Sequence, residues 1–548
     1  MIKLVSVAEM QTVEHEADAA GLSYAQMMEN AGYGLGEVVD TAYSHVNKKV
    51  ILGLVGSGNN GGDTLVALAY LAERGWKAIA YILRPRPEDD ILIQRLITLG
   101  GSILHFEMDK QATLLKDALK DSSVLLDGVL GTGFKLPLKP EIAISLGLIK
   151  KHLWEIVTPP HVVAVDCPSG VDCETGETVE ESIPAELTVT MAAVKRGLVS
   201  FPAFAYVGKI QVVPIGPLDE GLSLPAWIAI RRAVADENMV RSILPTRPLD
   251  AHKGTFGTAL VIAGSVNYTG AALLAGKAAY RVGTGLVTLC IPAPLHNVLA
   301  GHFPEATWLL LPSELGVISE DAYQVVRDQI DRVTAILVGP GFGLEETTRN
   351  FLKRLLEGGQ AGKGSGIGFM PVQKIGEASQ SIEFPAMVID ADGLKLLARI
   401  PGWYEKLKSP SILTPHPGEM SVLTGLDKNE IQAKRLEISE KYAHQWGHVV
   451  VLKGALTVVA SPDGRTSVIP VATPALARAG SGDVLAGLIV GMRAQGVDAY
   501  EAAVAGAWLH AQAGLLAADL LGGSASVLAG DVLEAVPHVI GQLNDKSS

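Results

Sequence analysis

The chain of 548 residues has little cysteine, few aromatic residues and no excess of positive charge. Its three cysteines, Cys167, Cys173 and Cys290, are too few for a disulfide framework or a cysteine-based zinc site. The formal net charge of -13 argues against a general surface for nucleic acid or membranes. We therefore expect a cytoplasmic protein that binds neither nucleic acid nor a membrane.

Long uncharged apolar runs are also scarce, although 48% of the residues are hydrophobic. The longest weakly charged stretch, residues 502–518, contains His510 and Gln512, which favours a buried helix over a membrane span. A chain of this length exceeds what one hydrophobic core supports, so two or three domains are expected. The apolar helices predicted near the carboxyl terminus favour a homo-oligomer.

Short β-branched runs alternate with amphipathic segments in both halves, which is the pattern of doubly wound α/β domains. The predicted buried strands are residues 48–56, 77–83, 122–127 and 161–166, then 257–264, 334–339, 386–392 and 448–454. Prolines and glycines interrupt the pattern within residues 214–227. We predict one domain over residues 1–224 and another over 225–548, the second carrying a mobile surface insertion at 358–384.

A glycine loop, "GSGNNGGD" (56–63), follows the first predicted strand and opens a helix. Glycines let backbone amides approach an anion, and the helix amino terminus adds a favourable potential. The loop is neither the dinucleotide fingerprint nor a Walker loop, because no lysine follows in the required place. A tight turn would explain the glycines but not the paired Asn59 and Asn60 before Asp63, so we predict a binding site.

Two further strands of the first half end in an aspartate, Asp127 and Asp166. A single such aspartate is often only a turn or a helix cap. Three polar strand ends in one domain point to a ligand site, because ligands bind beyond the carboxyl ends of parallel strands. Asn60, Asp127 and Ser169 offer hard oxygen ligands with too few carboxylates for a calcium cage, which favours a weakly held monovalent cation.

In the second half, "ARAGSGDVLAG" (477–487) places an aspartate behind a glycine turn at the start of an apolar helix. That aspartate, Asp483, either caps the helix or carries chemistry. His416, in "HPGE", likewise fits either a helix cap or a ligand contact. Asp390 and Asp392 either help to hold magnesium or end a strand.

The motifs of both halves, taken in order, resemble a known family. "GSGNNGGD" (56–63), "DGVLGTG" (127–133) and "DCPSGVD" (166–172) resemble the NAD(P)H-hydrate epimerase domain. "GPGFG" (339–343), "TPHPGEM" (414–420), "VLKG" (451–454) and "AGSGD" (479–483) resemble the ADP/ATP-dependent NAD(P)H-hydrate dehydratase of the ribokinase-like superfamily. The order is that of the bifunctional repair enzymes. The resemblance implies a Rossmann-like doubly wound sheet followed by a ribokinase-like α/β domain.

The same resemblance implies an enzyme that repairs hydrated NADH or NADPH. Its isomerase half would interconvert the R and S 6-hydroxy adducts. Its lyase half would phosphorylate the S adduct with ADP or ATP and then eliminate phosphate. Potassium at the epimerase site and magnesium with the nucleotide are the implied cofactors.

Site residues follow from the motif positions. Asp483 would take the hydroxyl proton in dehydration, and Asp166 would be the acid/base group in epimerisation. In the first half the hydrated cofactor would contact Asn59, Asn60, Gly61, Gly62, Asp63, Gly131, Thr132, Gly133, Phe134, Lys135, Leu136, Pro137 and Asp166. In the second half it would contact Ala271, Gly341, His416 and Asp483, while the nucleotide would contact Lys453, Gly454, Ala455, Leu456, Thr457 and Gly482. Potassium would be held by Asn60, Asp127 and Ser169. Thr64 replaces the family's usual glycine after Asp63 and is expected to restrict the loop.

Two other functions compete with repair. One is a ribokinase-like vitamin or sugar kinase fused to a noncatalytic Rossmann-like binding module, which would release a stable phosphoester. The other is a noncatalytic scaffold of RNA metabolism. A noncatalytic module should have lost its polar strand-end residues, whereas Asn60, Asp63, Asp127 and Asp166 are present. Basic stripes and interleaved aromatic residues, which RNA contact would require, are missing.

Overall fold

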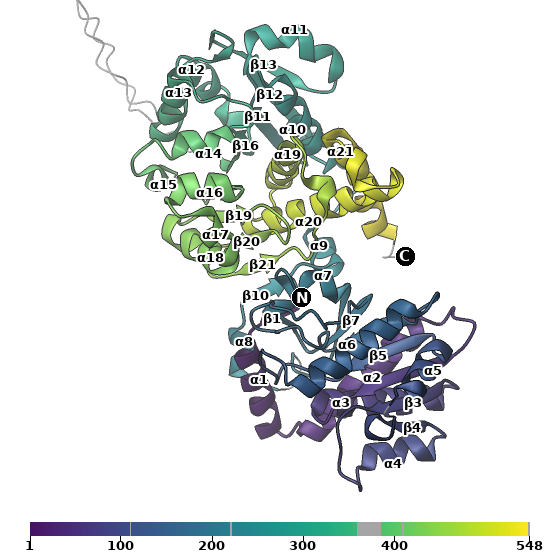
Figure 1. Ribbon diagram of the computed structural model, residues 1–548. Coiled ribbons are helices and arrows are strands. Elements are labelled where there is room, and N and C mark those ends of the chain that lie inside the picture. Colours follow the sequence, from purple (N-terminus) through teal and green to yellow (C-terminus); the bar gives the residue numbers. More distant parts are fainter. Residues whose placement is uncertain (110, 220–221, 359–384, 408–409, 546–548) are drawn as a thin grey trace, which may run out of the picture. The chain divides into compact units, whose positions relative to one another are not determined.

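The computed structural model describes residues 1–109, 111–219, 222–358, 385–407 and 410–545 (Figure 1). Apart from Gly358, the predicted insertion at 358–384 lies outside these residues. Packing divides the chain into two compact units, Ile2–Val234 and Ala235–Ser548. The division falls after the predicted boundary at 224/225, because strand β10 (Arg232–Val234) pairs with β1 (Ile2–Val5) at the start of the chain. In the described parts, no helix has the length and apolar character to cross a membrane.

The first unit contains a parallel sheet in the order β4-β3-β2-β5-β6-β7-β9. Its strands are β2 (Val50–Val55), β3 (Lys77–Ile82), β4 (Ser102–His105), β5 (Val124–Gly128), β6 (His161–Val165), β7 (Leu187–Met191) and β9 (Lys209–Val213). The four strands predicted for this half are confirmed. The order runs outward in both directions from β2 and β5, as in Rossmann-like folds, and ligands bind where it reverses.

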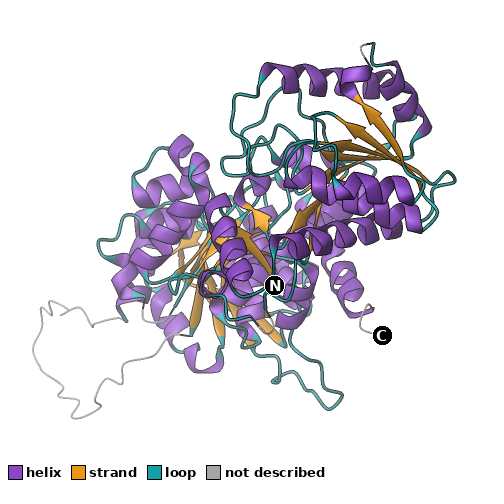
Figure 2. Ribbon diagram, turned by 90° about the horizontal axis from the view of Figure 1, so that it is seen from below, coloured by secondary structure: helices purple, strands orange, loops and turns teal. Residues whose placement is uncertain are grey.

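Helices cover both faces of this sheet (Figure 2). They are α1 (Val7–Ala19), α2 (Tyr24–Ala42), α3 (Asn59–Glu73), α4 (Ile91–Thr98), α5 (Thr113–Asp121) and α6 (Pro140–Glu155), followed by the short α7 (Phe204–Val207) and α8 (Pro225–Ala229). Alternate residues of one strand enter opposite cores: Ile51 packs with α2 and α3, and Leu52 packs with α5 and α6. Both faces are therefore buried, and the doubly wound prediction is confirmed.

A small strand group joins the two ends of this unit. β1 pairs in parallel with β8 (Val194–Lys195), and Val5 lies opposite Lys195. Ser6 then caps α1 in a reciprocal capping box with Glu9. The first residues of the chain thus bring α1 beside the end of the parallel sheet.

The second unit has a sheet in the order β13-β12-β11-β16-β17-β18-β19-β20-β21, parallel as far as β19 and antiparallel beyond it. Its strands are β11 (Thr258–Ile262), β12 (Leu286–Pro292), β13 (Thr307–Leu311), β16 (Ala335–Val338), β17 (Ala386–Ile389), β18 (Ile412–Leu413), β19 (Val449–Leu452), β20 (Val458–Ala460) and β21 (Thr466–Val468). A hairpin of β14 (Ser313–Glu314) and β15 (Val317–Ile318) stands apart from it. The four strands predicted here are also confirmed.

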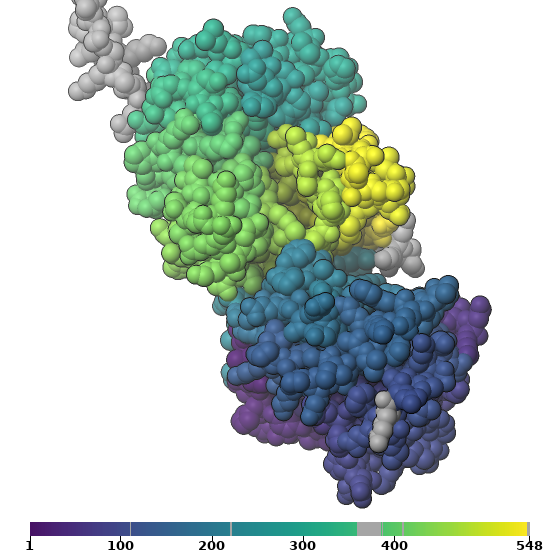
Figure 3. All heavy atoms as spheres, viewed as in Figure 1, coloured from purple at the N-terminus to yellow at the C-terminus, as the bar shows by residue number. Residues whose placement is uncertain are grey.

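One face of this sheet is buried by α9 (Glu237–Ile243), α10 (Thr269–Arg281), α19 (Ser481–Ala494), α20 (Ala499–Leu520) and α21 (Ala529–Asp545). The remaining helices are α11 (His296–Leu299), α12 (Ala322–Arg327), α13 (Glu346–Glu357), α14 (Asp392–Leu397), α15 (Trp403–Lys406), α16 (Pro417–Thr424), α17 (Lys428–Ala433) and α18 (Arg435–Trp446). Helix α20 is the buried helix predicted for residues 502–518. In Figure 3 the yellow atoms of the carboxyl-terminal segment border the teal atoms of the same unit. Arg281 of α10 pairs with Glu534 of α21.

Candidate active sites

A cavity of about 800 Å³ lies in the first unit, at the carboxyl ends of β2 and β5 where the strand order reverses. Of the residues predicted to contact the hydrated cofactor, it is lined by Asn59, Asn60, Asp63, Gly131, Thr132, Gly133, Phe134 and Asp166. Glu14 of α1 and Lys195 of β8 line it as well. The structure therefore brings together three polar strand ends that are far apart in the sequence.

Five predicted contact residues are not among those that line this cavity: Gly61, Gly62, Lys135, Leu136 and Pro137. Helix α3 already begins at Asn59, so the loop proper ends at Gly58. A Cβ atom at Gly61 would lie 2.1 Å from the carbonyl oxygen of Gly56, so this glycine serves the packing of the helix against its strand. Beyond Phe134 the chain runs along the surface, with Lys135 and Pro137 exposed.

Thr64 lies inside α3 rather than in the loop. Its hydroxyl group donates to the carbonyl oxygen of Asn60 at 2.8 Å, and the side chain is fully buried. Gly128 leaves room for it, because a Cβ there would lie 1.8 Å from the Thr64 oxygen. Thr64 therefore acts on helix–strand packing, where the backbone is helical in any case.

Asp166 forms a buried ion pair with Lys195. The Lys195 Nζ lies 2.5 Å from Asp166 Oδ1 and also donates to Thr190 Oγ1 at 3.1 Å and to the Met191 carbonyl at 3.0 Å. Only 2% of Lys195 is exposed. Burial alone would lower the pKa of the lysine, but the Asp166 carboxylate outweighs it and raises the pKa above its ordinary value. Lys195 is therefore a charged group at neutral pH.

Asp63 and Glu14 face the same cavity. Burial raises the pKa of Asp63 well above its usual value, the Asp166 charge raises it further, and Lys195 opposes both. Burial also raises the pKa of Glu14. Lys195 is thus paired with Asp166, while Asp63 and Glu14 lie nearby with raised pKa values, which favours their protonated forms. Sequence reasoning missed Glu14 and Lys195, although a basic residue in the apolar run "MAAVK" (191–195) was a usable signal.

The residues predicted to hold potassium meet beside this cavity. Asp127 is fully buried, and its carboxylate accepts from the Ser169 hydroxyl at 2.5 Å and the Ser169 amide at 2.8 Å. Burial raises the pKa of Asp127, and no cation in the described residues offsets this. The Asn60 amide nitrogen donates to the carbonyls of Leu130 and Val165, so its oxygen is the atom available to a ligand. An oxygen-only set around an unpaired buried carboxylate fits a monovalent cation.

In the second unit, Asp483 occupies the first turn of α19. Gly480 precedes the helix with a φ of 86°, in the left-handed region that favours glycine. Burial raises the pKa of Asp483 to about 7, the charges of Asp390 and Asp392 add to this, and Lys453 opposes it. Asp483 is therefore a partly buried carboxyl group with a pKa of about 7, as a general base requires.

Lys453 lies beside this aspartate in an ion pair of its own. Its Nζ is 2.6 Å from Asp390 Oδ1 and 3.5 Å from Glu419 Oε2, and Asp390 is only 1% exposed. The Thr414 hydroxyl donates to the same Asp390 oxygen at 2.7 Å. A Cβ at Gly482 would lie 3.6 Å from Lys453 Nζ, so the two predicted nucleotide contacts are neighbours. Asp390 is thus the partner of Lys453, and Glu419 is a buried site residue that sequence reasoning missed.

His416 caps a helix. Its Nδ1 accepts from the backbone amides of Gly418 at 2.9 Å and Glu419 at 3.3 Å at the start of α16, so the capping alternative is confirmed. Gly341 has a φ of +64°, and a Cβ there would lie 3.0 Å from the Cβ of Ala271. Ala271 and Gly341, two predicted substrate contacts, are therefore adjacent.

The segment after Lys453 presents peptide groups, rather than side chains, to a bound nucleotide. Gly454 and Ala455 are exposed, the Leu456 side chain is buried, and the Thr457 hydroxyl donates to the Gly454 carbonyl at 2.9 Å. A nucleotide would therefore meet peptide groups there.

In the described part of this unit, the acidic residues do not form a carboxylate cage for magnesium. Asp392 is 2.9 Å from Lys395 and accepts from the Gly343 amide, while Asp390 is taken by Lys453. Across the described residues, no group of three or more histidine, cysteine or acidic side chains could hold a metal ion. Magnesium would therefore be bound mainly through the nucleotide phosphates, which are its usual ligands.

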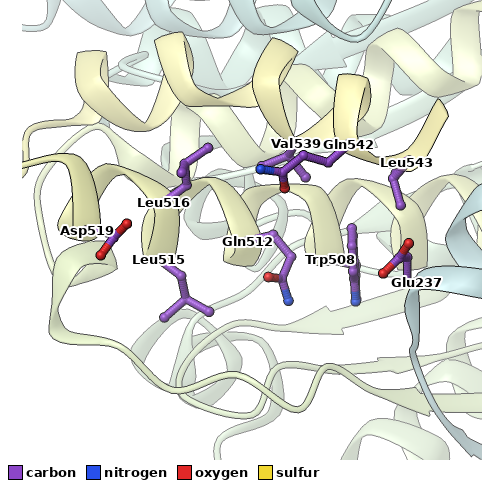
Figure 4. Close-up of a pocket in the computed structure, with 9 residues that line it drawn as sticks. All are labelled: Glu237, Trp508, Gln512, Leu515, Leu516, Asp519, Val539, Gln542 and Leu543. Carbon is purple, nitrogen blue, oxygen red and sulfur yellow. The ribbon is translucent and has the colours of Figure 1, made fainter. Parts of the chain in front are cut away.

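A separate groove of about 450 Å³ lies between α9, α20 and α21 (Figure 4). It is lined by Glu237, Trp508, Gln512, Leu515, Leu516, Asp519, Val539, Gln542 and Leu543. None of these residues was predicted for either site, so the groove belongs to neither.

Comparison with known proteins identifies the family. Residues 24–197 match the family described as YjeF-related protein N-terminus, and residues 259–538 match NAD(P)H-hydrate dehydratase. A bifunctional NAD(P)H-hydrate repair enzyme of Moorella thermoacetica is 35% identical over 99% of this chain and 97% of its own length. The chain belongs to the family of bifunctional NAD(P)H-hydrate repair enzymes.

Other members of this repair-enzyme family are similarly close. The protein of Salinibacter ruber is 32% identical over 98% of this chain and 94% of its own. Among solved structures, an ADP/ATP-dependent NAD(P)H-hydrate dehydratase of Bacillus subtilis, co-crystallised with ATP/Mg²⁺, is 31% identical and covers 57% of this chain and 98% of its own, with a TM-score of 0.45. The predicted family and α/β fold class are confirmed, while the role of each site residue stays a prediction.

Proposed function

We propose that this chain returns hydrated NADH or NADPH to the working cofactor. The predicted domain 1–224 would interconvert the R and S adducts, and the predicted domain 225–548 would dehydrate the S adduct with ADP or ATP. One observation carries the proposal: each unit of a repair-enzyme chain holds an aspartate and a lysine–carboxylate pair at the ligand-binding end of its sheet. Asp166 is the carboxylate of its own pair, whereas Asp483 lies beside the pair of Lys453 and Asp390.

Dehydration begins at Asp483. Its carboxylate takes the proton of the 6-hydroxyl group while that oxygen bonds to the terminal phosphorus of the nucleotide and the bond from this phosphorus to the bridging oxygen breaks, which releases AMP from ADP or ADP from ATP. The backbone amides at Gly480–Gly482 and the amino terminus of α19 stabilise the charge on the transferring group. The electron pair of the ring nitrogen then expels phosphate, the released phosphate accepts a proton from the neighbouring carbon, and the double bond is restored.

Epimerisation requires a planar carbon. The ring nitrogen supplies the electron pair as the hydroxyl group leaves as water, taking a proton from the carboxyl group of Asp63 or Glu14, and another water molecule adds to the other face. Asp166 accepts the proton of the incoming water and returns it to the acid that gave up its own, which is ordinary acid/base chemistry for carboxyl groups. Every R adduct is thereby made available to a dehydratase that uses the S form.

Asn60, Asp127 and Ser169 would hold potassium, which supplies positive charge beside the buried Asp127. Replacing potassium chloride by tetramethylammonium chloride should lower epimerisation and the thermal stability of the first unit. Ser169→Ala should blunt this response by removing one ligand. Equal behaviour in both salts would contradict the assignment.

The decisive assay follows recovery of reduced-nicotinamide absorbance from mixed R and S adducts. Wild type should recover both adducts with ADP or ATP. Asp166→Ala should stall after the S fraction, and Asp483→Asn should recover almost none. Such a pattern separates the two activities within one chain.

Product analysis tests the kinase alternative. Repair releases free phosphate together with the reduced cofactor, whereas a vitamin or sugar kinase would leave a stable phosphoester. Light scattering on the purified chain tests the predicted homo-oligomer.

A further inference from the structure

The contacts of Lys195 use all its donors. An ammonium group has three N–H bonds, and the three nearest acceptors, Asp166, Thr190 and the Met191 carbonyl, account for them. All three acceptors belong to the protein. Lys195 therefore has no donor left for a substrate, although it lines the cavity.

The hydrogen bonds that Asp166 accepts converge on one of its two carboxylate oxygens. Its Oδ1 accepts from the Thr190 hydroxyl at 2.9 Å, from the Met191 amide at 3.1 Å and from Lys195. Its backbone φ of 65° lies in the left-handed region, which costs energy in a residue other than glycine. One oxygen thus anchors the carboxylate, and Oδ2 is the atom available to the cavity.

We propose that Lys195 is a positioning residue of the epimerase site: it fixes Asp166 through Oδ1, places a positive charge beside that carboxylate, and so leaves Oδ2 as the proton acceptor. The assignment rests on the proposed epimerisation.

The charged surroundings explain why a cation is needed. Asp63 on α3 and Glu14 on α1 face Asp166 and Lys195, and the thiols of Cys167 and Cys173 lie beside them. Without Lys195, Asp166 would share a buried cavity with two other carboxyl groups. Such groups compete for protons, and one of them loses its charge.

The test compares Lys195→Met and Lys195→Gln with Lys209→Met, which removes an exposed lysine from β9 of the same unit. At pH 7 both Lys195 variants should lower kcat for epimerisation about 10- to 100-fold, within the range of a mispositioned acid/base group, with KM changed less than about threefold. The acidic limb of the pH–rate profile should shift to higher pH by about one unit or more. Lys209→Met should behave as wild type.

A second measurement does not depend on turnover. In chains labelled with carbon-13 at aspartate carboxyl groups, and assigned with Asp166→Asn, the Asp166 signal should titrate at higher pH in both Lys195 variants. The proposal would be overturned if the Lys195 variants changed neither the titration of the Asp166 carboxyl group nor the acidic limb of the pH–rate profile. A loss of activity without these changes is what a purely structural lysine predicts. If wild type fails to interconvert the adducts, the proposed function falls, and the carboxyl titration still decides the role of Lys195. The thermal unfolding transition of the first unit in the same samples reports whether each variant has folded.

Discussion

The two units bury the same kind of pair and use it differently. Lys195 lies 2.5 Å from Asp166 in the first unit, and Lys453 lies 2.6 Å from Asp390 in the second. In the first unit the predicted catalytic carboxylate is the lysine's own partner. In the second, Asp483 stands outside the pair, and its pKa rises to about 7. The lysine is therefore bonded to the predicted catalytic carboxylate in the first unit and to a different carboxylate in the second.

This difference matters because a buried ion pair adds little to stability. Removing both ions of such a pair is often neutral, whereas removing one leaves a buried charge without a partner. The two pairs are thus better explained by the charge state that each imposes on its cavity.

The largest expected effect tests the unpaired aspartate. Asp483→Asn should lower dehydration about 10³-fold, because it removes the general base, while epimerisation by the same sample should be unchanged. Asp331→Asn, an exposed aspartate of the same unit, is the matched control. Near-native dehydration by a folded Asp483→Asn protein would end the proposed role.

A smaller effect is expected from breaking the second pair. Lys453→Met should lower dehydration about 10²-fold and destabilise the second unit by about 3 kcal/mol, because Asp390 would be left buried and unpaired. Adding Asp390→Leu should recover most of the stability but not the activity, as measured by urea unfolding and turnover. Recovery of both would mean that the pair is only structural.

The pH dependence of dehydration sharpens the comparison. With a pKa of about 7 for Asp483, kcat/KM should fall about tenfold per pH unit below that value, since only the carboxylate accepts a proton. Asp331→Asn should show the same profile. A flat profile down to pH 5 would contradict the assignment of Asp483 as the base.

The smallest expected effect concerns stability. Because the folded-state pKa of Asp483 is raised, its protonation favours folding at low pH, and this contribution is lost as pH rises through about 7. Asp483→Asn should therefore stabilise the ligand-free second unit at pH 8 by about 1–3 kcal/mol, and by much less near pH 4. Urea unfolding at the two pH values measures the difference, and equal effects would rule out this linkage.

Sequence reasoning found the strands and their polar ends because both signals are local. The runs at 48–56 and 448–454 became β2 and β19, and the residues after them reached the sites. Lys195 and Glu14 were not predicted, because their positions beside the cavity depend on the pairing of β1, which places Val5 opposite Lys195. The pairing of Asp390 with Lys453 was not predicted for the same reason, because the two residues follow different strands. Pairings over such distances leave no local pattern.

The register of β1 also bears on how the protein is handled in the laboratory. Because Ile2–Val5 hold α1 against the epimerase cavity, shortening the chain at its first residues should open that cavity on the Glu14 side while the parallel sheet stays intact. An affinity tag would be better attached at the opposite end of the chain when isomerase turnover is to be measured.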